Sequence, residues 1–222
     1  MRKRFSLPLL AAATLVLSAC TSKKVSPDAY SGFLHDYSLL TEHQSPSGQT
    51  VLSWVTPALK PERYTQVYIE PSQFYPNPLP TERIPQTTLS DTTWYYDAAL
   101  KHELGKVMKV VTTPGPNTLI VRPAITRVAA STQSLRYYEW LPITLVAAGV
   151  STATGIRDQD SEIATEVVFL DGGTGVVVAE VVRKGTGLTL ENDKQVITTA
   201  DVKGVLDGWA SDLRNSYVAM RK

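Results

Sequence analysis

The feature that most constrains the fold of this chain is the position of its only cysteine, Cys20. Cys20 ends a segment with a basic start at residues 2–4 and an apolar run over residues 7–17. A basic start, a short apolar run and small residues before a cleavage point are the marks of an export signal. The run is too short for a membrane-spanning helix, which takes about 20 residues. With no second cysteine to form a disulfide, the fold after this point must be held by its hydrophobic core alone.

Residues 17–20 (LSAC) resemble a bacterial lipobox. At such a motif the cysteine sulfur receives a diacylglycerol, the chain is cut before the cysteine, and the new amine is usually acylated (palmitate is the typical chain). We therefore expect Cys20 to be the lipidation site, with the membrane as a partner through this anchor. Each buried methylene contributes about 0.8 kcal/mol, so several acyl chains make a lasting attachment. The alternative interpretation is a buried free thiol that happens to follow an export signal.

The residue after the cysteine is Thr21. In enterobacterial lipoproteins an aspartate at this position retains the protein in the inner membrane. The sequence therefore favours the outer membrane of the bacterial cell envelope, with the protein facing the periplasm.

The chain divides into three parts. We expect a lipoprotein signal peptide at residues 1–19, the lipidated cysteine with a flexible polar tether at 20–32, and a single domain at 33–222. Removal of the signal peptide leaves about 200 residues, a length that suits one domain. Once the leader is removed, acidic side chains slightly outnumber basic ones, and no basic stripe stands out, so nucleic acid is not an expected partner.

Hydrophobic periodicity predicts an α/β (α+β) fold. The order of elements is typical of a two-layer sandwich, with a mixed or mostly antiparallel sheet and two long helices packed on one face. The expected elements are a strand at 64–70, a helix from Ser90 or Asp91 to Val111, a strand at 119–128, a hairpin of 162–170 and 176–183, and a helix at 199–220.

The same patterns predict three finer details. Pro123 inside its strand favours an edge strand or a bulge. Residues 162–170 have one face suited to lie under helices and one expected to be partly wet. In the last helix, capped by Thr198 or Thr199, Asp212 is among the polar residues expected to point away from the apolar stripe.

Residues 140–150 carry no charge and follow two tyrosines. One interpretation is an interaction surface that dips into the membrane interface or contacts an envelope protein, because aromatic side chains suit a place where one end is apolar and the other wet. The other interpretation is a buried element of the core. The residues of the possible interaction surface are Tyr137, Tyr138, Trp140, Leu141, Ile143 and Leu145.

The sequence identifies no catalytic residue, metal ligand or cofactor. Its three histidines, His35, His43 and His102, are expected to be solvated surface residues. Residues 171–175 (DGGTG) are expected to form a hairpin turn, since they lack the lysine of a phosphate loop and the spaced carboxylates of a calcium loop. The carboxylates of residues 158, 160 and 162 could hold a cation or lie in a solvated loop.

Five blocks of sequence together resemble one known family. The chain is similar, over nearly all of its mature length, to the uncharacterised bacterial lipoproteins called domain of unknown function 3313. The resemblance implies a lipoprotein of the Gram-negative envelope, and it supplies no reaction and no catalytic residues. The blocks are residues 30–37, 114–119, 122–126, 155–160 and 206–210.

These observations favour a non-enzymatic accessory or scaffold protein in envelope assembly, transport or maintenance. Two alternatives remain open from the sequence: an envelope hydrolase with an unrecognised site, and a module that binds peptidoglycan or another small envelope ligand.

Overall fold

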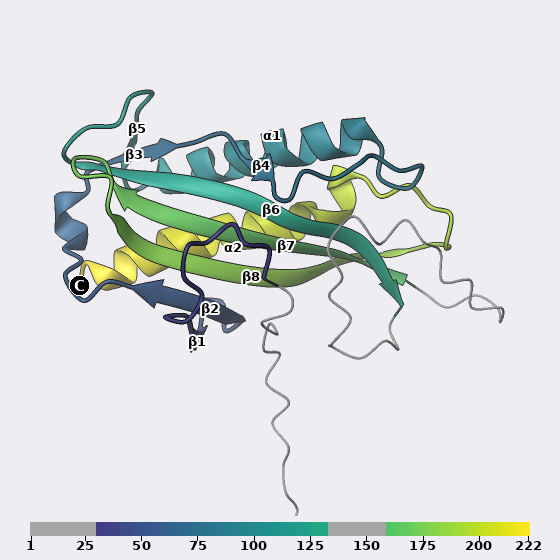
Figure 1. Ribbon diagram of the computed structural model, residues 1–222, viewed down its shortest axis with the longest axis horizontal. Coiled ribbons are helices and arrows are strands. Elements are labelled where there is room, and N and C mark those ends of the chain that lie inside the picture. The colour runs from purple at the N-terminus through teal and green to yellow at the C-terminus, as the bar shows by residue number, and fades with distance from the viewer. Residues whose placement is uncertain (1–29, 133–158) are drawn as a thin grey trace, which may run out of the picture.

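The computed structural model describes residues 30–132 and 159–222, and Figure 1 shows how their elements are arranged. The strands form one eight-stranded mixed sheet in the order β1-β2-β8-β7-β6-β3-β5, with β4 pairing to β6 beside this path. Its elements are β1 (Thr41–Gln44), β2 (Thr50–Val55), the 3-10 helix η2 (Pro61–Arg63), β3 (Gln66–Ile69), β4 (Gln73–Phe74), α1 (Gln86–Leu104), β5 (Lys109–Val110), β6 (Thr118–Thr132), β7 (Gln159–Asp171), β8 (Val177–Leu190) and α2 (Thr199–Met220).

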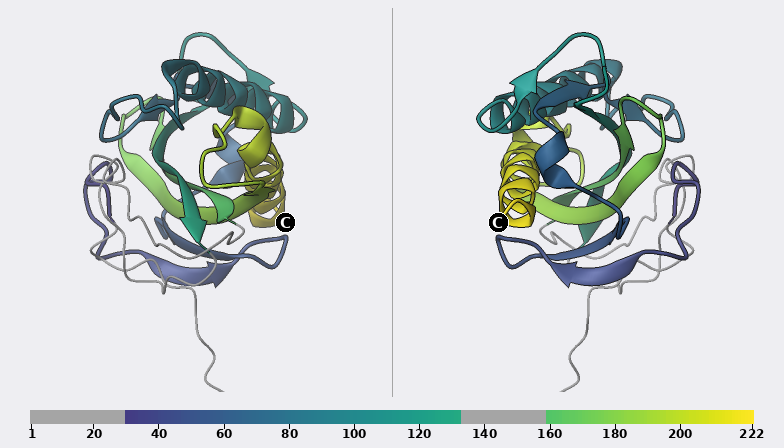
Figure 2. Two further views of the ribbon diagram at one scale, coloured as in Figure 1. Left: turned by 90° about the vertical axis from the view of Figure 1, so that its right-hand side faces the viewer. Right: turned by 90° about the vertical axis from the view of Figure 1, so that its left-hand side faces the viewer.

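Both long helices lie on one face of the sheet, as the end-on views of Figure 2 show. The predicted two-layer α+β architecture is therefore confirmed. The main core lies between the helices and the sheet, where Tyr96 and Leu100 of α1 meet Leu206 and Trp209 of α2. Among the described residues, no helix has the length and apolar character needed to cross a membrane.

The predicted hairpin is the centre of the sheet. β7 pairs with β8 and with β6, in both cases antiparallel. The turn at residues 171–175 is held by Asp171, whose carboxylate accepts hydrogen bonds from the backbone N–H groups of Gly173 and Thr174. Gly175 has a φ of 70°, in the left-handed region that favours glycine. The expected hairpin turn is confirmed.

Pro123 lies in a strand with neighbours on both sides, and the structure shows how it is tolerated. On one side β6 pairs with β7 along its length. On the other side β6 pairs with β3 only as far as Val121 and with β4 only from Ala124. Pro123 therefore falls where one short partner has ended and the next begins, so its missing N–H removes no ladder bond. The expected bulge lies close by, between Ile125 and Arg127.

Helix α1 begins and ends earlier than the sequence predicts. It starts at Gln86, with Pro85 as N-cap, rather than at Ser90 or Asp91, and it ends at Leu104 instead of continuing to Val111. After the helix the backbone of Lys109 donates to Thr65, which starts the short strand β5 beside β3. The hydrogen bonds of strand pairing therefore determine the structure of residues 109–110, although their apolar spacing continues that of the helix.

Helix α2 matches its predicted bounds, and Thr198 forms a capping box with Asp201. One expectation for this helix is wrong. Asp212 does not point into solvent but is 3% exposed, because it pairs with Arg183 of β8. A charged partner on the sheet lets a carboxylate occupy a position next to the apolar stripe.

The second face of the sheet is covered by the N-terminal arm, which we define as residues 30–40. Leu34 of the arm is buried against Val168, Val182 and Leu52 in a second, smaller cluster. The sequence pattern predicts that this face is partly wet. The arm covers it, and the face is therefore buried. Residues 30–32, assigned to the tether by the sequence, take part in these contacts.

Candidate functional site

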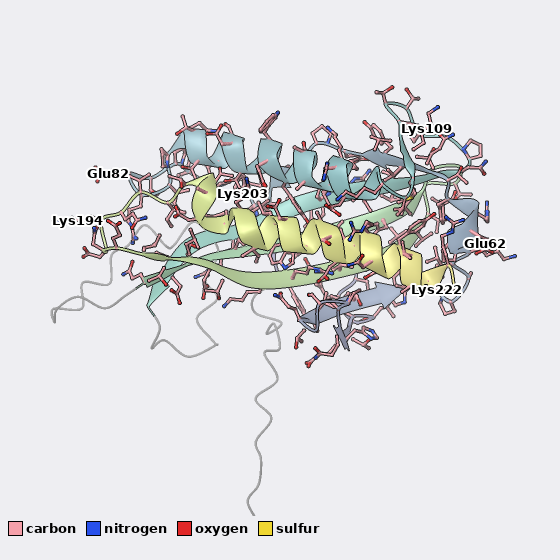
Figure 3. The ribbon with its side chains drawn as sticks, turned by 180° about the vertical axis from the view of Figure 1, so that it is seen from behind. Glu62, Glu82, Lys109, Lys194, Lys203 and Lys222 are labelled. Carbon is pink, nitrogen blue, oxygen red and sulfur yellow. The ribbon has the colours of Figure 1, made fainter. Side chains whose placement is uncertain are left out.

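An apolar cavity of about 190 Å³ lies among the described residues. It lies between the β1–β2 hairpin, η2, the start of β8 and the C-terminal half of α2, on the helix-bearing side of the sheet; Figure 3 shows α2 running along this side. Most of the wall is hydrocarbon. The apolar wall residues are Val51, Val55, Leu59, Pro61, Leu104, Met108, Leu119, Phe169, Val178, Ala179, Val181, Leu213 and Met220.

The alternation of β2 builds one wall of this cavity. Side chains of a strand point to opposite faces in turn, so Val51, Ser53 and Val55 share the face that lines the cavity. Leu52 faces the other way and packs against the N-terminal arm. The same short strand therefore contributes one face to the cavity wall and the other face to the cluster under the N-terminal arm.

Two tyrosines add aromatic surface to the wall. Tyr64 and Tyr217 line the cavity, and both hydroxyl groups are already engaged. Tyr217 donates to the backbone carbonyl of Tyr64, and Tyr64 donates to Asp171 at 2.9 Å. Burial, followed by the bond to Asp171, raises the pKa of Tyr64 to about 12. The Tyr64 hydroxyl therefore stays protonated near neutral pH.

Arg183 is the only fully charged side chain in the wall of the described cavity. Its Nη1 donates to Asp212 at 2.9 Å, and the side chains of the two residues are 6% and 4% exposed. Asp212 also accepts from the backbone N–H and the hydroxyl of Ser47, in the turn of the β1–β2 hairpin. Burial acts to raise the pKa of Asp212, but the bonds from Ser45, Ser47 and Arg183 outweigh it and hold the pKa below its ordinary value.

The ion pair thus fixes the hairpin over the cavity. Asp212 joins Ser47 of the hairpin to Arg183 of the sheet, so the turn of the hairpin is attached to helix α2. A buried pair of this kind contributes geometry more than net stability, because desolvation offsets much of its attraction. Its role here is to set the position of one cavity wall.

Two further buried carboxylates, Glu166 and Glu180, lie on the opposite face of the sheet. Glu166 of β7 is 1% exposed and accepts hydrogen bonds from the backbone and hydroxyl of Ser31 and from Tyr37. Glu180 of β8 is 3% exposed. Burial, together with the charge of Asp36, raises the pKa of Glu180. Glu166 binds the arm to the sheet, so it has a partner within the fold.

The three histidines are exposed, as expected. His43 lies at the cavity, where its Nε2 is 2.8 Å from the hydroxyl of Thr41. Within residues 30–132 and 159–222, no group of three or more His, Cys, Asp or Glu residues could hold a metal ion. Of the carboxylates named as a possible cation site, Glu162 forms ion pairs with Arg127 and Lys184 instead.

Two predicted sites cannot be compared with this structure. Cys20 lies outside the described residues, and so does the possible interaction surface. Both stay predictions. The latter consists of Tyr137, Tyr138, Trp140, Leu141, Ile143 and Leu145.

Sequence reasoning missed the cavity because its wall comes from segments far apart in the chain. One available signal was a charged residue inside a β-branched run, Arg183. Charged side chains are almost never fully buried unless they are paired. A charge in a strand that otherwise reads as buried therefore indicates a partner elsewhere in the chain.

Comparison with known proteins places the chain in a family. It is 38% identical over 198 residues to the uncharacterized lipoprotein YdcL of Escherichia coli K12, and the aligned region covers 89% of this chain and 89% of YdcL. The match to the YdcL of Escherichia coli O157:H7 has the same identity and extent.

Similar solved structures include a PelC dodecamer from Paraburkholderia phytofirmans (TM-score 0.39, 11% identity, 74% of this chain and 98% of that one). Another is protein XCC0632 from Xanthomonas campestris (TM-score 0.41, 11% identity, 75% and 90%). A third is a putative neuraminyllactose-binding hemagglutinin homolog from Helicobacter pylori (TM-score 0.38, 8% identity, 75% and 89%). The family model described as protein of unknown function (DUF3313) matches residues 29–213, and the chain therefore belongs to the DUF3313 family.

Proposed function

We propose that this protein is a non-enzymatic accessory lipoprotein of the bacterial envelope, which holds an apolar group of its partner or ligand in the cavity beside α2. The protein is anchored through acylated Cys20 to the outer membrane and faces the periplasm. The export signal, the lipobox at residues 17–20, Thr21 and the lipoprotein name of its relative support this placement.

The observation that carries the binding role is the chemistry of the cavity wall. A small-molecule site is typically concave and mostly apolar, with a few placed polar groups. This cavity has that composition, with Arg183 as its one full charge among the described wall residues. Its volume of about 190 Å³ exceeds the roughly 150 Å³ cavity that holds benzene in an engineered protein. It therefore suits one aromatic or branched group, or a short stretch of acyl chain.

The polar groups nearby favour binding over catalysis. His43 is bonded to Thr41 rather than to a serine, and Asp212 is occupied by Ser47 and Arg183. A nucleophile needs a base within hydrogen-bond reach, and the base needs an orienting group. The pairs present here hold the hairpin in place instead.

The proposal can be tested by photo-crosslinking in living cells. Val55 lines the cavity and is 40% exposed, so a photoreactive amino acid at this position reports what enters. Thr87, on an exposed part of α1, is the control position. We expect one defined adduct, a lipid or an envelope protein, at position 55 and none at position 87.

A second variant ties the adduct to the cavity. Ser216 lines the cavity and is half-buried, so Ser216→Leu fills part of the space without removing a core side chain. The adduct at position 55 should disappear in this background and persist with Ser90→Leu, an exposed serine on α1. An adduct that survives filling, or that forms equally at position 87, overturns the proposal.

A further inference from the structure

The face of the sheet away from the helices carries a group of apolar side chains at the point where the described chain begins. Tyr30 stacks on Tyr37 with the ring centroids 4.1 Å apart. Phe33 contacts Tyr75, which follows β4, with the ring centroids 5.5 Å apart. Leu39 in the same arm is 45% exposed, and Tyr75 is 38% exposed. We call these five residues the aromatic patch.

The loop between β4 and α1 extends this apolar surface. Figure 2 shows the loop and the N-terminal arm on the side of the sheet that faces away from α2. Leu79 lies in this loop, four residues after Tyr75, and is 81% exposed. Two segments distant in sequence therefore present apolar side chains on one side of the molecule. Exposed apolar groups that cluster in this way mark a surface that meets a protein or a membrane.

The start of the described chain indicates which of these covers the patch. The first described residue is Tyr30, a member of the patch, and the expected lipid site is Cys20. The ten residues 20–29 span at most about 35 Å when fully extended. The bilayer that holds an acylated Cys20 is therefore always within this distance of the patch. A tethered target is present at a high effective concentration, whereas a separate partner must arrive by diffusion.

We propose that the aromatic patch and Leu79 lie against the bilayer in which Cys20 is anchored, with their side chains in its interfacial layer. Aromatic side chains concentrate at this layer, because the ring contacts hydrocarbon while a phenol hydroxyl stays at the level of the headgroups. The inference goes beyond the proposed role of the cavity and shares with it only the acylated Cys20. In this orientation α2 and the cavity face away from the membrane, so the cavity stays open to the periplasm.

Fluorescence quenching by lipid tests this orientation. Cys20 is the only cysteine and its sulfur is consumed by acylation, so an introduced cysteine is the one free thiol. Leu79→Cys and Lys203→Cys are each labelled with nitrobenzoxadiazole in the full lipidated chain. Lys203 is an exposed residue of α2, on the side of the molecule that Figure 3 shows. The chain is reconstituted in phosphatidylcholine vesicles that contain a lipid with a nitroxide close to its headgroup. We expect the nitroxide to quench the label several-fold more strongly at position 79 than at position 203.

A charge in the patch tests whether the patch makes the contact. Leu39→Glu places a carboxylate at the interface, and moving a charge into an apolar environment is costly. Quenching at position 79 should then fall to the level at position 203. Val218→Glu is the matched control, because Val218 is 38% exposed and lies on α2. It should leave the quenching at position 79 unchanged, and neither variant removes a buried side chain.

The outcomes separate this inference from the proposed function. Equal quenching at positions 79 and 203 would show that the domain has no preferred orientation and would overturn the inference. Quenching at position 79 that survives Leu39→Glu would also overturn it, because the patch would then not make the contact. If the unlabelled chain does not sediment with the vesicles, the acyl anchor is absent, and the proposed placement in the membrane fails together with the inference. The adduct expected at position 55 of the cavity depends on none of these results.

Discussion

The hydroxyl of Tyr37 donates a 2.6 Å hydrogen bond to Oε2 of Glu166, across 129 positions of sequence. Glu166 lies under the arm on the sheet face opposite the helices, and Ser31 supplies two further hydrogen bonds to it. The stretch that emerges from the expected tether is thus attached to the centre of the sheet. This contact explains how a buried carboxylate is tolerated in strand β7.

Replacement of Tyr37 by phenylalanine tests that attachment. Tyr37→Phe removes one of three hydrogen bonds to a buried carboxylate, and hydrogen bonds to charged groups contribute about 1.5–3 kcal/mol. We expect the free energy of unfolding of the full chain to fall by about that amount in urea titration. Tyr75→Phe, on a tyrosine that is 38% exposed, is the control and should change it little. Equal effects of the two variants would show that the bond to Glu166 contributes nothing.

Asp212→Asn tests the ion pair that holds the hairpin. The change leaves Arg183 as an unpaired buried charge, and breaking such a pair costs about 3–5 kcal/mol. Asp207→Asn, on the exposed side of the same helix, should cost less than about 1 kcal/mol. Urea unfolding at pH 7 measures both, and a cost below that of Asp207→Asn would contradict the structural role of the pair.

The same pair predicts a pH dependence. The folded-state pKa of Asp212 lies below its ordinary value of 3.8. The stability from this ionisation is therefore complete above pH 3.8 and is lost as the pH falls through the folded-state pKa. Stability curves of the wild type and Asp212→Asn should approach each other below pH 3.8. Parallel curves across this range would show that the aspartate is not stabilised in the fold.

Gly185→Ala tests how closely α2 packs on the sheet. A Cβ at Gly185 would lie 2.4 Å from Cγ1 of Val205 and 3.0 Å from the ring of Trp209, so the helix must shift. Overpacking of this kind typically costs about 1–3 kcal/mol. Gly204→Ala, in the same helix with nothing within 4 Å, should instead stabilise the protein by about 0.5–1 kcal/mol. Thermal unfolding followed by circular dichroism should show opposite signs, and a neutral Gly185→Ala would contradict the close contact.

Cys20→Ser tests the lipid anchor. Without the sulfur no diacylglycerol can be attached, so the variant should remain unprocessed or leave the envelope fraction, whereas Thr21→Ser should behave as the wild type. Cell fractionation with the outer and inner membranes separated on a sucrose gradient measures this. Normal maturation and sedimentation of Cys20→Ser with the envelope would show that the cysteine is not the anchor.

The sequence was sufficient for features that depend on local patterns. The 22-residue periodicity and Thr198 cap of α2 determine its bounds, and the turn chemistry of residues 171–175 determines the hairpin. The alternation of β-branched residues in β7 and β8 determines that they are strands. These signals act over a few residues, so one sequence carries them completely.

Tertiary structure decided what depends on partners far apart in the chain. The segment after α1 pairs with β3 as strand β5, so the helix ends before this segment. The ion pair with Arg183 allows Asp212 to be buried. The N-terminal arm buries a face that was expected to be partly wet, and the cavity wall joins β2, β8, η2 and α2. Burial is a property of the packed arrangement, because a side chain loses its water only when another segment covers it. The physical reason is that local patterns specify which face of an element is apolar, while only packing specifies what covers that face and what space is left.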